Sequence, residues 1–334
     1  MFISIIITNY NGLNYLENCF DSILNQNLSN FEIIFADDCS TDKSVDFIKK
    51  KYPKVKISSL KKNSGLSVNS NQARKLCKGD LLFFMNNDTY FKKNFFNDVL
   101  SHFKEEIDAI CVKQYEYDPI SQNDTSNSFL DYDDLGSGVD CFGYVCLAKL
   151  SKFIFYSDAH IMIRKDFFDK IGGFDNNFLL YGEDVDLFFR FHIAGGKLFS
   201  TKKIYFNHDT SCTIGYDAIF QSSSKRRELV ERQSLNMMLT YYSPIITFFL
   251  LIIRVPLNFF EMLFLIFFNN PKSIFKIYFG AYIWNIKKIP AILKKRSFVK
   301  KIRKISDFQL LKMTYIGYRK LGVFLERKKI PRIN

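Results

Sequence analysis

The chain begins with the segment FISIIITNYNG (residues 2–12), in which an isoleucine-rich run is followed at once by polar and turn-forming residues. A short apolar run bounded by turn residues is typical of a strand that is buried on both faces. We therefore predict a first strand over residues 2–7, with polar side chains directly beyond its carboxyl end.

The same alternation of apolar strands and amphipathic helices continues through the first ninety residues. Strands are predicted over residues 2–7, 31–36, 55–60 and 81–85, with helices over 15–24, 43–51 and 63–77. Short connections between alternating strands and helices indicate an α/β fold, a mostly parallel sheet wound with helices on both faces. Ligands of such sheets bind in the crevice beyond the carboxyl ends of the strands.

Polar clusters follow each of these predicted strands and should converge on one crevice. The residues expected there are Asn9, Tyr10, Asp37, Asp38, Asn63 and Asp88. The sequence has no GxGxxG after the first strand and no GxxxxGK[ST], so the two commonest glycine-rich phosphate loops are absent. We expect a carboxylate-held Mg²⁺ or Mn²⁺ to meet diphosphate charge instead. The alternatives are turn formation for Asp37 and Asp38 and capping of a helix at Phe95 for Asp88.

A second segment, YGEDVDLFFR (residues 181–190), places three carboxylates within four residues. Apolar residues then recur at helical spacing, which predicts a helix from about Gly182 to Ala194. Carboxylates in a first turn are favoured by the helix dipole, and this is the purely structural interpretation of Glu183 and Asp184. Asp186 and Arg190 have the spacing of a surface i,i+4 ion pair.

The middle of the chain is less regular. Between residues 115 and 155 we expect a loop or hairpin region near the site, mobile over 121–139. Strands are predicted again at 161–164 and 203–206, with a short helix at 166–171 between them. Polar residues, His208 among them, follow the last strand. His102, His160 and His192 have no partner that the sequence identifies.

Charge divides the chain into two parts. The net charge is +13, but residues 285–334 hold 16 Lys and Arg against 2 acids, so the remainder is close to neutral. A basic tail on a neutral body indicates an anionic partner for the tail, a membrane surface rather than nucleic acid. The seven cysteines have no metal or CxxC spacing and no signal peptide precedes the first strand, so we expect reduced thiols in the cytoplasm.

The tail combines apolar, aromatic and basic residues. Residues 240–268 are very apolar, but the longest uninterrupted run, residues 248–253, is far shorter than the ~18 residues of a membrane span. Arg254, Asn258 and Glu261 form one polar stripe at helical spacing. With the lysines and aromatic residues of 272–304, this pattern predicts amphipathic helices lying on the inner face of the membrane. A protein core or a homodimer interface is the alternative.

Taken in order, these motifs resemble those of family-2 glycosyltransferases with a GT-A fold, and among them rhamnosyltransferase-like enzymes of bacterial surface polysaccharide assembly. The resemblance covers about the first 240 residues. The motifs that carry it are Thr8-Asn9-Tyr10-Asn11, residues 37–42, Asn63-Ser64-Gly65 with Asn71, Gly79-Asp80 leading to Asn86-Asn87-Asp88, residues 172–175, and residues 183–186 with Arg190.

The resemblance implies a role for each of these positions. It implies nucleotide binding for Thr8, Asn9, Tyr10, Asp37, Asp38, Asn63, Gly65, Asn86 and Asn87, with Asp38 bonding the base. Asp88 matches the last carboxylate of the metal-binding DxD motif, and His208 matches a histidine that completes the metal shell in some relatives. Asp184 matches the catalytic base, with Glu183 supporting it or touching the acceptor. Asn86 departs from the pattern, because the first DxD acid is missing.

We therefore expect a catalytic GT-A domain over residues 1–215, with a nucleotide-sugar half (1–110) and an acceptor half (111–215), and a helical membrane-associating region over 216–334. The expected reaction is inverting, metal-dependent transfer of a sugar to a lipid-linked glycan, with Asp88 and Asp184 facing one anomeric carbon. The donor favoured is dTDP-rhamnose, followed by UDP-galactose or UDP-N-acetylglucosamine. The alternative is a non-catalytic or degenerate nucleotide-sugar binding protein.

Overall fold

The computed structural model describes residues 1–118, 123–124, 137–147, 151–153, 160–178, 182–208, 221–222, 224–327 and 332–333. The chain forms two compact units. Unit 1 comprises Met1–Gly136, Phe155–Phe191 and Gly195–Thr210, and unit 2 comprises Ser137–Ile154, His192–Ala194 and Ser211–Asn334. Unit 2 thus takes in Ser137–Ile154, which the sequence analysis counted with the acceptor half of the catalytic domain. Most of the segment expected to be mobile, residues 121–139, lies outside the described residues.

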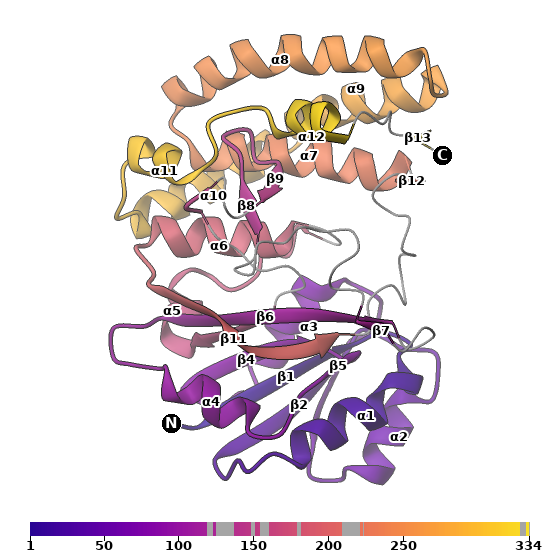
Figure 1. Ribbon diagram of the computed structural model, residues 1–334, viewed down its shortest axis with the longest axis vertical. Helices are drawn as coiled ribbons and strands as arrows, with labels where there is room; N and C mark the ends of the chain where they lie inside the picture. Colours follow the sequence, from indigo (N-terminus) through magenta and orange to yellow (C-terminus); the bar gives the residue numbers. More distant parts are fainter. Residues whose placement is uncertain are drawn as a thin grey trace. The chain divides into compact units, whose positions relative to one another are not determined.

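Unit 1 is built around a mixed, mainly parallel sheet (Figure 1). Its elements are β1 (Ile3–Asn9), α1 (Leu13–Leu24), β2 (Phe31–Asp37), α2 (Ser44–Lys51), β3 (Lys56–Ser59), α3 (Leu66–Arg74), β4 (Leu81–Asn86), β5 (Thr89–Tyr90), α4 (Phe95–Ser101), β6 (Ala109–Asp118), β7 (Asn123–Asp124), β10 (Ile161–Arg164), α5 (Lys165–Lys170), α6 (Glu183–Ile193) and β11 (Leu198–His208). The strand order is β3-β2-β1-β4-β10-β6-β11-β5, with β7 paired to β6.

The four N-terminal strands run parallel, as predicted, and their register aligns the polar residues at their carboxyl ends. Asn9 of β1 lies opposite Asp37 of β2, and Thr8 lies opposite Asn86 of β4. Beyond β4 the sheet becomes mixed, because β10 is antiparallel to both β4 and β6. The strand β6 was not predicted, since only its first four residues, Ala109–Val112, are apolar.

Helices cover both faces of the sheet, which confirms the wound α/β fold. On one face, apolar residues of α1, α2 and α4 pack with alternate residues of β1, β2 and β4 in a single core cluster. On the other face, Phe84 of β4 packs on Phe168 of α5, with ring centroids 4.8 Å apart. Part of the phenylalanine-rich composition thus lies in this core, where Phe83 contacts Phe91, Phe95 and Phe96.

Unit 2 is mainly helical. Its elements are β8 (Ser137–Val139), β9 (Val145–Leu147), β12 (Gln221–Ser222), α7 (Ser224–Tyr241), α8 (Pro244–Ile266), α9 (Pro271–Lys287), α10 (Ile289–Ile302), α11 (Asp307–Met313), α12 (Arg319–Arg327) and β13 (Arg332–Ile333). The strands β8 and β9 pair antiparallel, in the region where the sequence predicted a loop or hairpin. The C-terminal helices are those expected from the sequence of the tail.

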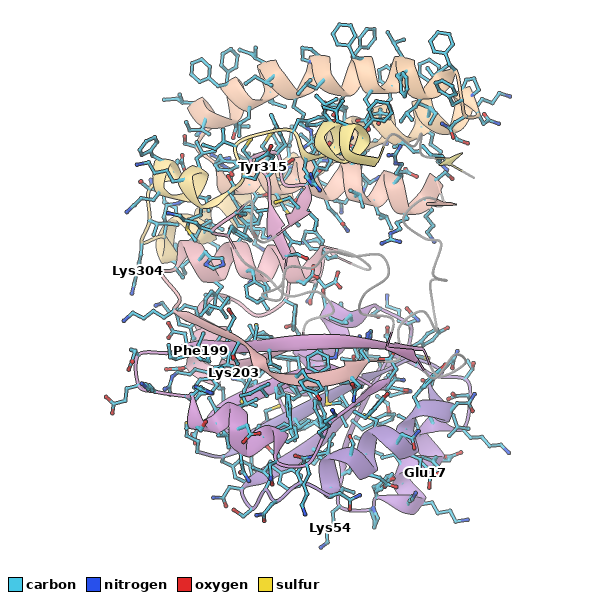
Figure 2. All side chains as sticks on the ribbon, viewed as in Figure 1. Glu17, Lys54, Phe199, Lys203, Lys304 and Tyr315 are labelled. Atoms are coloured by element: carbon cyan, nitrogen blue, oxygen red, sulfur yellow. The ribbon has the colours of Figure 1, made fainter. Side chains whose placement is uncertain are left out.

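Helix α8 has its polar side turned inward and its apolar side turned outward. Arg254 and Asn258 of the predicted polar stripe are 1% and 3% exposed, whereas Phe248 and Phe260 on the opposite side are 60% and 66% exposed. Figure 2 shows a row of aromatic rings along the outer edge of this helix. Among the described residues it alone is long and apolar enough to cross a membrane by length and composition, although the sequence analysis had argued against a span.

Candidate functional site

The carboxyl ends of β1, β2 and β4 are joined by a network of side-chain hydrogen bonds. Asn9 Nδ2 donates to Asp37 Oδ1 and to Ser40 Oγ, each at 3.0 Å. Asn87 Nδ2 donates to Asn9 Oδ1 at 2.5 Å. Next to this network, Thr8 Oγ1 donates to Asn86 Oδ1 at 3.1 Å. Residues from three separate motifs thus lie side by side, because the parallel register brings their strand ends together.

Asp37 acts within this network as a turn residue. Its Oδ1 accepts from Ser40 Oγ at 2.5 Å and its Oδ2 accepts from the Ser40 backbone N–H at 3.0 Å. These are the contacts that the turn alternative expects of an aspartate bonding its own backbone. Cys39 adopts a left-handed conformation inside this turn, with φ of 63°. The carboxylate of Asp37 therefore shapes the loop after β2 and holds the Asn9 amide in place.

Gly12 allows the loop after β1 to approach the loop after β4. A Cβ atom at this position would overlap the Asn87 side-chain amide and crowd Asn9 Oδ1. Asn11, just before it, has φ of 51°, and its side-chain oxygen accepts from the backbone N–H of Thr41 at 2.7 Å. The loops after β1 and β2 are thereby joined through Asn11 and Thr41, to which the sequence analysis assigned no role.

Asp38 organises the start of α3. Its two carboxylate oxygens accept the backbone N–H groups of Ser64 at 2.7 Å and Gly65 at 2.8 Å. A carboxylate has about four lone-pair sites, so two remain for a donor on a bound molecule. Asn63, just before these residues, is exposed, and Tyr10 at the end of β1 is 52% exposed.

Asp88 and His208 are brought together by the pairing of the short strand β5 with the end of β11. Strand β5 pairs antiparallel with β11, so that Thr89 lies opposite His208. The result is a distance of 3.1 Å between Asp88 Oδ1 and His208 Nε2. Asp88 does not cap α4, because the N-cap residue of this helix is Asn94, directly before Phe95. The capping alternative for Asp88 is therefore wrong.

His160 supports the same corner. Its Nε2 atom lies 2.8 Å from Thr89 Oγ1 and 3.4 Å from the backbone nitrogen of Asn86. A backbone N–H can only donate, so Nε2 is an acceptor and the Thr89 hydroxyl is the second donor. The ring also stacks on Phe206 and meets the ring of His208 edge to face. Sequence reasoning found no partner for His160, because these contacts depend on the pairing of β10 with β4.

The corner is suited to a divalent cation. Oδ1 of Asp88 is buried and, among the described residues, accepts no hydrogen bond of good geometry although it lies against the imidazole of His208. A carboxylate oxygen and an imidazole nitrogen are both ligands for Mn²⁺ and related ions. The described residues hold no group of three or more His, Cys, Asp or Glu that could form a metal site. The protein would thus supply two ligands, and a bound diphosphate would have to complete the shell.

The buried thiol of Cys19 is affected by the charge of Asp88. Burial, and then this charge, raise the pKa of the Cys19 thiol well above its usual range. The thiol is therefore neutral beside the ion-free pair. The six cysteines in the described part of the chain are free, and Cys212 lies outside the described residues.

Glu183, Asp184 and Asp186 lie in the first turn of α6, as predicted. Glu183 and Asp184 are each 8% exposed, and Asp184 Oδ1 accepts the backbone N–H of Val185 at 2.7 Å. Both carboxylates thus lie where the positive end of the helix dipole stabilises negative charge. Residues 179–181 just before them lie outside the described residues. That Asp184 and Asp88 share one sugar stays a prediction.

Asp186 and Arg190 form the expected i,i+4 pair, but it is buried, so the prediction of a surface pair is wrong. Their side chains are 0% and 3% exposed, and Arg190 Nη2 lies 2.7 Å from Asp186 Oδ2. Arg190 also donates to the carbonyl oxygens of Ile171 and Gly173. The pair therefore fastens α6 to the glycine turn after α5, and it is buried because this turn packs against the helix.

The fold of the chain is that of known nucleotide-sugar transferases. A solved structure of Staphylococcus aureus TarS, residues 1–349 in complex with UDP-GlcNAc, has a TM-score of 0.54 at 19% identity and covers 72% of this chain and 67% of that one. GalNAc-T7 with UDP, GalNAc and Mn²⁺ also has a TM-score of 0.54, at 16% identity over 64% of this chain and 44% of that one. At these identities the likeness shows the fold alone, a GT-A-like α/β fold.

Sequence comparison identifies the family. Residues 4–172, about half of the chain, match glycosyl transferase family 2, and residues 156–211 match the N-terminal domain of galactosyltransferase. The chain therefore belongs to glycosyl transferase family 2. The rhamnosyltransferase-like subgroup expected from the sequence is not among these matches and stays a prediction.

Similar proteins include bacterial polysaccharide synthases. A chondroitin synthase of Escherichia coli is 31% identical over 113 residues, which are 33% of this chain and 16% of that protein. A poly(ribitol-phosphate) beta-glucosyltransferase of Bacillus spizizenii is 40% identical over 96 residues, 27% of this chain and 15% of that protein. An uncharacterized glycosyltransferase of Rickettsia typhi is 29% identical over 209 residues, 62% of this chain and 61% of that protein. The chain spans only 12–16% of the first three curated relatives.

Proposed function

We propose that this protein is an inverting, metal-dependent glycosyltransferase that moves a sugar from a nucleoside diphosphate to a hydroxyl group of a glycan. The observation that carries the proposal is the 3.1 Å approach of Asp88 and His208 at the end of β4, in a family-2 fold. In the proposed reaction a bond forms between the acceptor oxygen and the anomeric carbon. The bond between that carbon and the diphosphate oxygen breaks, and the diphosphate leaves with the bonding electron pair.

Asp88 and His208 are the residues that would hold Mg²⁺ or Mn²⁺. A divalent ion bound there supplies positive charge for the oxygens of the leaving diphosphate. Since the described residues offer one carboxylate at this corner, affinity for the ion should depend on the nucleotide. The similar structure of GalNAc-T7 holds Mn²⁺ together with UDP, which supports the choice of ion.

Asp184 is the proposed base. Its carboxylate would accept the proton of the acceptor hydroxyl as the new bond forms, a contribution of ~10²–10⁴-fold in rate. Glu183, beside it in the first turn of α6, would bind the acceptor or hold Asp184 in position. A single displacement of this kind inverts the anomeric configuration.

The donor is proposed to carry a pyrimidine base. Asp38 keeps free acceptor sites for an imide N–H, which uracil and thymine both carry, and the exposed ring of Tyr10 offers a stacking surface. The sequence resemblance favours dTDP-rhamnose, whereas UDP and UDP-GlcNAc are bound in the similar structures of TarS. These donors, with UDP-galactose, form the panel to be tested.

The acceptor is proposed to be a lipid-linked glycan at the inner membrane surface. Support comes from the outward apolar side of α8 and from relatives named for chondroitin and poly(ribitol-phosphate) synthesis. A membrane-bound acceptor would explain why a family-2 domain is joined to helices whose apolar side faces outward.

A thermal-shift panel of nucleotide sugars with and without Mn²⁺ tests the function directly. We expect stabilisation by one donor class only when Mn²⁺ is present, followed by slow metal-dependent donor hydrolysis without acceptor. The alternative, a non-catalytic nucleotide-sugar binding protein, rests on Asn86 in place of an acid, here bonded to Thr8. Binding without any hydrolysis or transfer would favour it, and no binding of any nucleotide sugar would refute both.

A further inference from the structure

Most of the exposed large apolar side chains in the described part of unit 2 lie on α8 and α9 and the segments next to them. Eighteen of the 28 exposed large apolar side chains lie between Ile245 and Leu293, within fifty residues of the chain. We call these side chains the apolar face. On α8 they include Ile245, Phe248, Phe249, Ile252, Phe259, Phe260 and Leu263. Soluble monomers rarely expose a continuous surface of this kind, so it marks an interaction site.

Basic residues accompany the apolar face, and acidic residues do not. Residues 272–304 contain eleven Lys and Arg and no Asp or Glu. On α9 the exposed Lys276 and Lys287 lie on the same helix as the exposed Phe279 and Ile283. An apolar surface bordered by lysines is complementary to a leaflet of anionic phospholipid, in which acyl chains lie beneath negatively charged headgroups.

The polar stripe of α8 is committed to the interior of unit 2. Arg254 Nη1 donates to the Phe142 carbonyl at 2.9 Å, and Arg254 Nη2 donates to Ser234 Oγ at 2.8 Å. Asn258 Oδ1 lies 2.9 Å from the Tyr318 hydroxyl. A backbone carbonyl between β8 and β9 and side chains of α7 and of the C-terminal part of the chain thus bond the polar groups near the middle of α8.

Charge in this interior is balanced by Lys320 of α12. Its Nζ lies 2.6 Å from Glu231 Oε1 and also pairs with Glu261, while Tyr144 donates to Glu231 Oε2 at 2.6 Å. Burial alone would raise the pKa of Glu231, but Lys320 and Arg254 lower it, so this carboxyl stays ionised. If α8 left the unit to cross a bilayer, it would carry the charged side chains of Arg254 and Glu261 into lipid and lose their partners in unit 2, which is unfavourable.

We propose that α8 lies in the plane of the membrane, with its apolar face in one leaflet and the lysines of α9 and α10 on anionic phospholipid headgroups. This inference rests on the membrane setting of the proposed function, and it specifies the orientation and the lipid class. Unit 2 stays folded, and the interior ion pairs remain intact. The chain is then held at one surface and does not span the bilayer.

Tryptophan fluorescence tests the orientation, since Trp284 is the single tryptophan of the chain. In a Trp284→Phe background, tryptophan is placed singly at Phe248, Phe259 and Phe267, all exposed. Residues 248 and 267 are ~28 Å apart along a helix. With lipids brominated at defined depths, we expect the three probes to be quenched at one shallow depth. A deep probe at 259 between two shallow ones would show a spanning helix and overturn the proposal.

Vesicle sedimentation of the full chain tests the lipid class. We expect binding to vesicles with phosphatidylglycerol, weakened by salt, and little binding to pure phosphatidylcholine. Phe259→Asn with Phe260→Asn should weaken binding by about tenfold or more, and Lys276→Gln with Lys287→Gln by about tenfold on anionic vesicles only. Phe308→Asn, an exposed phenylalanine of α11 outside the apolar face, is the matched control and should bind like the wild type.

Other outcomes separate the possible partners. No vesicle binding by the wild type overturns the proposal, and a concentration-dependent dimer broken by the Phe259/Phe260 variant would assign the face to a second copy. Donor hydrolysis is measured on the same samples without lipid. Donor hydrolysis by a wild-type chain that binds no vesicles would refute this inference alone, whereas vesicle binding by a wild-type chain without donor hydrolysis would refute the proposed activity.

Discussion

Asp88 Oδ1 and His208 Nε2 lie 3.1 Å apart, although one residue follows the fourth strand of the chain and the other ends its last long strand. The antiparallel pairing of β5 with β11 sets this distance.

Removing the carboxylate by Asp88→Asn should lower Mn²⁺ affinity in the presence of UDP by more than ~100-fold, beyond the usual effect of an outer-shell change. Calorimetric titration of Mn²⁺ measures this. Asp98→Asn, an exposed carboxylate on α4, is the control. Unchanged affinity in Asp88→Asn would remove the pair as the metal site.

His160 should act as a positioning residue for this corner. It accepts from the Thr89 hydroxyl and packs against His208, so His160→Phe keeps the ring but removes the acceptor. Losses from such outer-shell changes are ~10–100-fold in metal affinity. We expect Mn²⁺ affinity with UDP to fall in this range, and His160→Asn to restore part of it. Nucleotide affinity without metal should stay the same, and an equal loss of both would indicate general damage instead.

Asp184→Asn should abolish sugar transfer and leave nucleotide binding nearly intact. The expected loss in turnover is ~10²–10⁴-fold, the usual contribution of a general base. Radiolabelled transfer and a UDP titration give the two quantities. Wild-type turnover in this variant would exclude Asp184 as the base.

Asp186→Asn, two residues further along the same helix, should have the opposite profile. It leaves the buried Arg190 without its counter-ion, and breaking a buried pair in this way costs ~3–5 kcal/mol of unfolding free energy. Urea unfolding of the two variants separates the roles. Equal stability of Asp184→Asn and Asp186→Asn would contradict the structural role assigned to the Asp186–Arg190 pair.

Asp140 should make unit 2 more stable in mild acid. Burial raises the pKa of this carboxyl to about 6, although it accepts the backbone N–H groups of Phe142, Tyr144 and Arg319. Because the native state holds this proton more tightly than the unfolded state, the contribution of Asp140 to stability falls as pH rises from about 4 to 6. The change is roughly 3 kcal/mol in unfolding free energy.

The Asp140→Asn variant isolates this contribution from other titrating groups. It removes the titration while keeping an oxygen for Phe142 and Tyr144, although the bond from the Arg319 N–H is lost. The melting temperature of the wild type, relative to that of the variant, should therefore fall as pH rises from 4 to 6. A difference independent of pH would show that Asp140 keeps an ordinary pKa.

Much of unit 1 could be predicted from the sequence because its first strands are marked by short patterns of neighbouring residues. Apolar runs ended by polar residues fix the first four strands, and parallel pairing then forces their polar ends together. This is why Asn9 and Asp37 were expected to converge and are hydrogen-bonded, in a network that Asn87 joins. The roles of individual members depend on contacts that spacing does not show, such as the Ser40 hydroxyl between Asn9 and Asp37.

The features that sequence reasoning missed depend on long-range pairing. His160 gains its contacts when β10 inserts antiparallel beside β4, and nothing in the neighbouring residues indicates that pairing. The burial of Asp186 and Arg190 likewise comes from the glycine turn after α5 folding against α6. The polar stripe of α8 was found by its spacing, but its inward direction is decided by Glu231 and Lys320, from other helices.

The position of Lys320 has a consequence for biosynthesis. Glu261 leaves the ribosome 59 residues ahead of the lysine that neutralises it, and most of the exposed phenylalanines of α8 emerge earlier still. Until α12 is synthesised, the nascent chain carries the apolar helix α8 and also Glu261 without the lysine that pairs with it. Synthesis of α12 therefore supplies the counter-ion of Glu261, and we expect a nascent chain stalled before α12 to bind chaperones or membranes more readily than one that contains it.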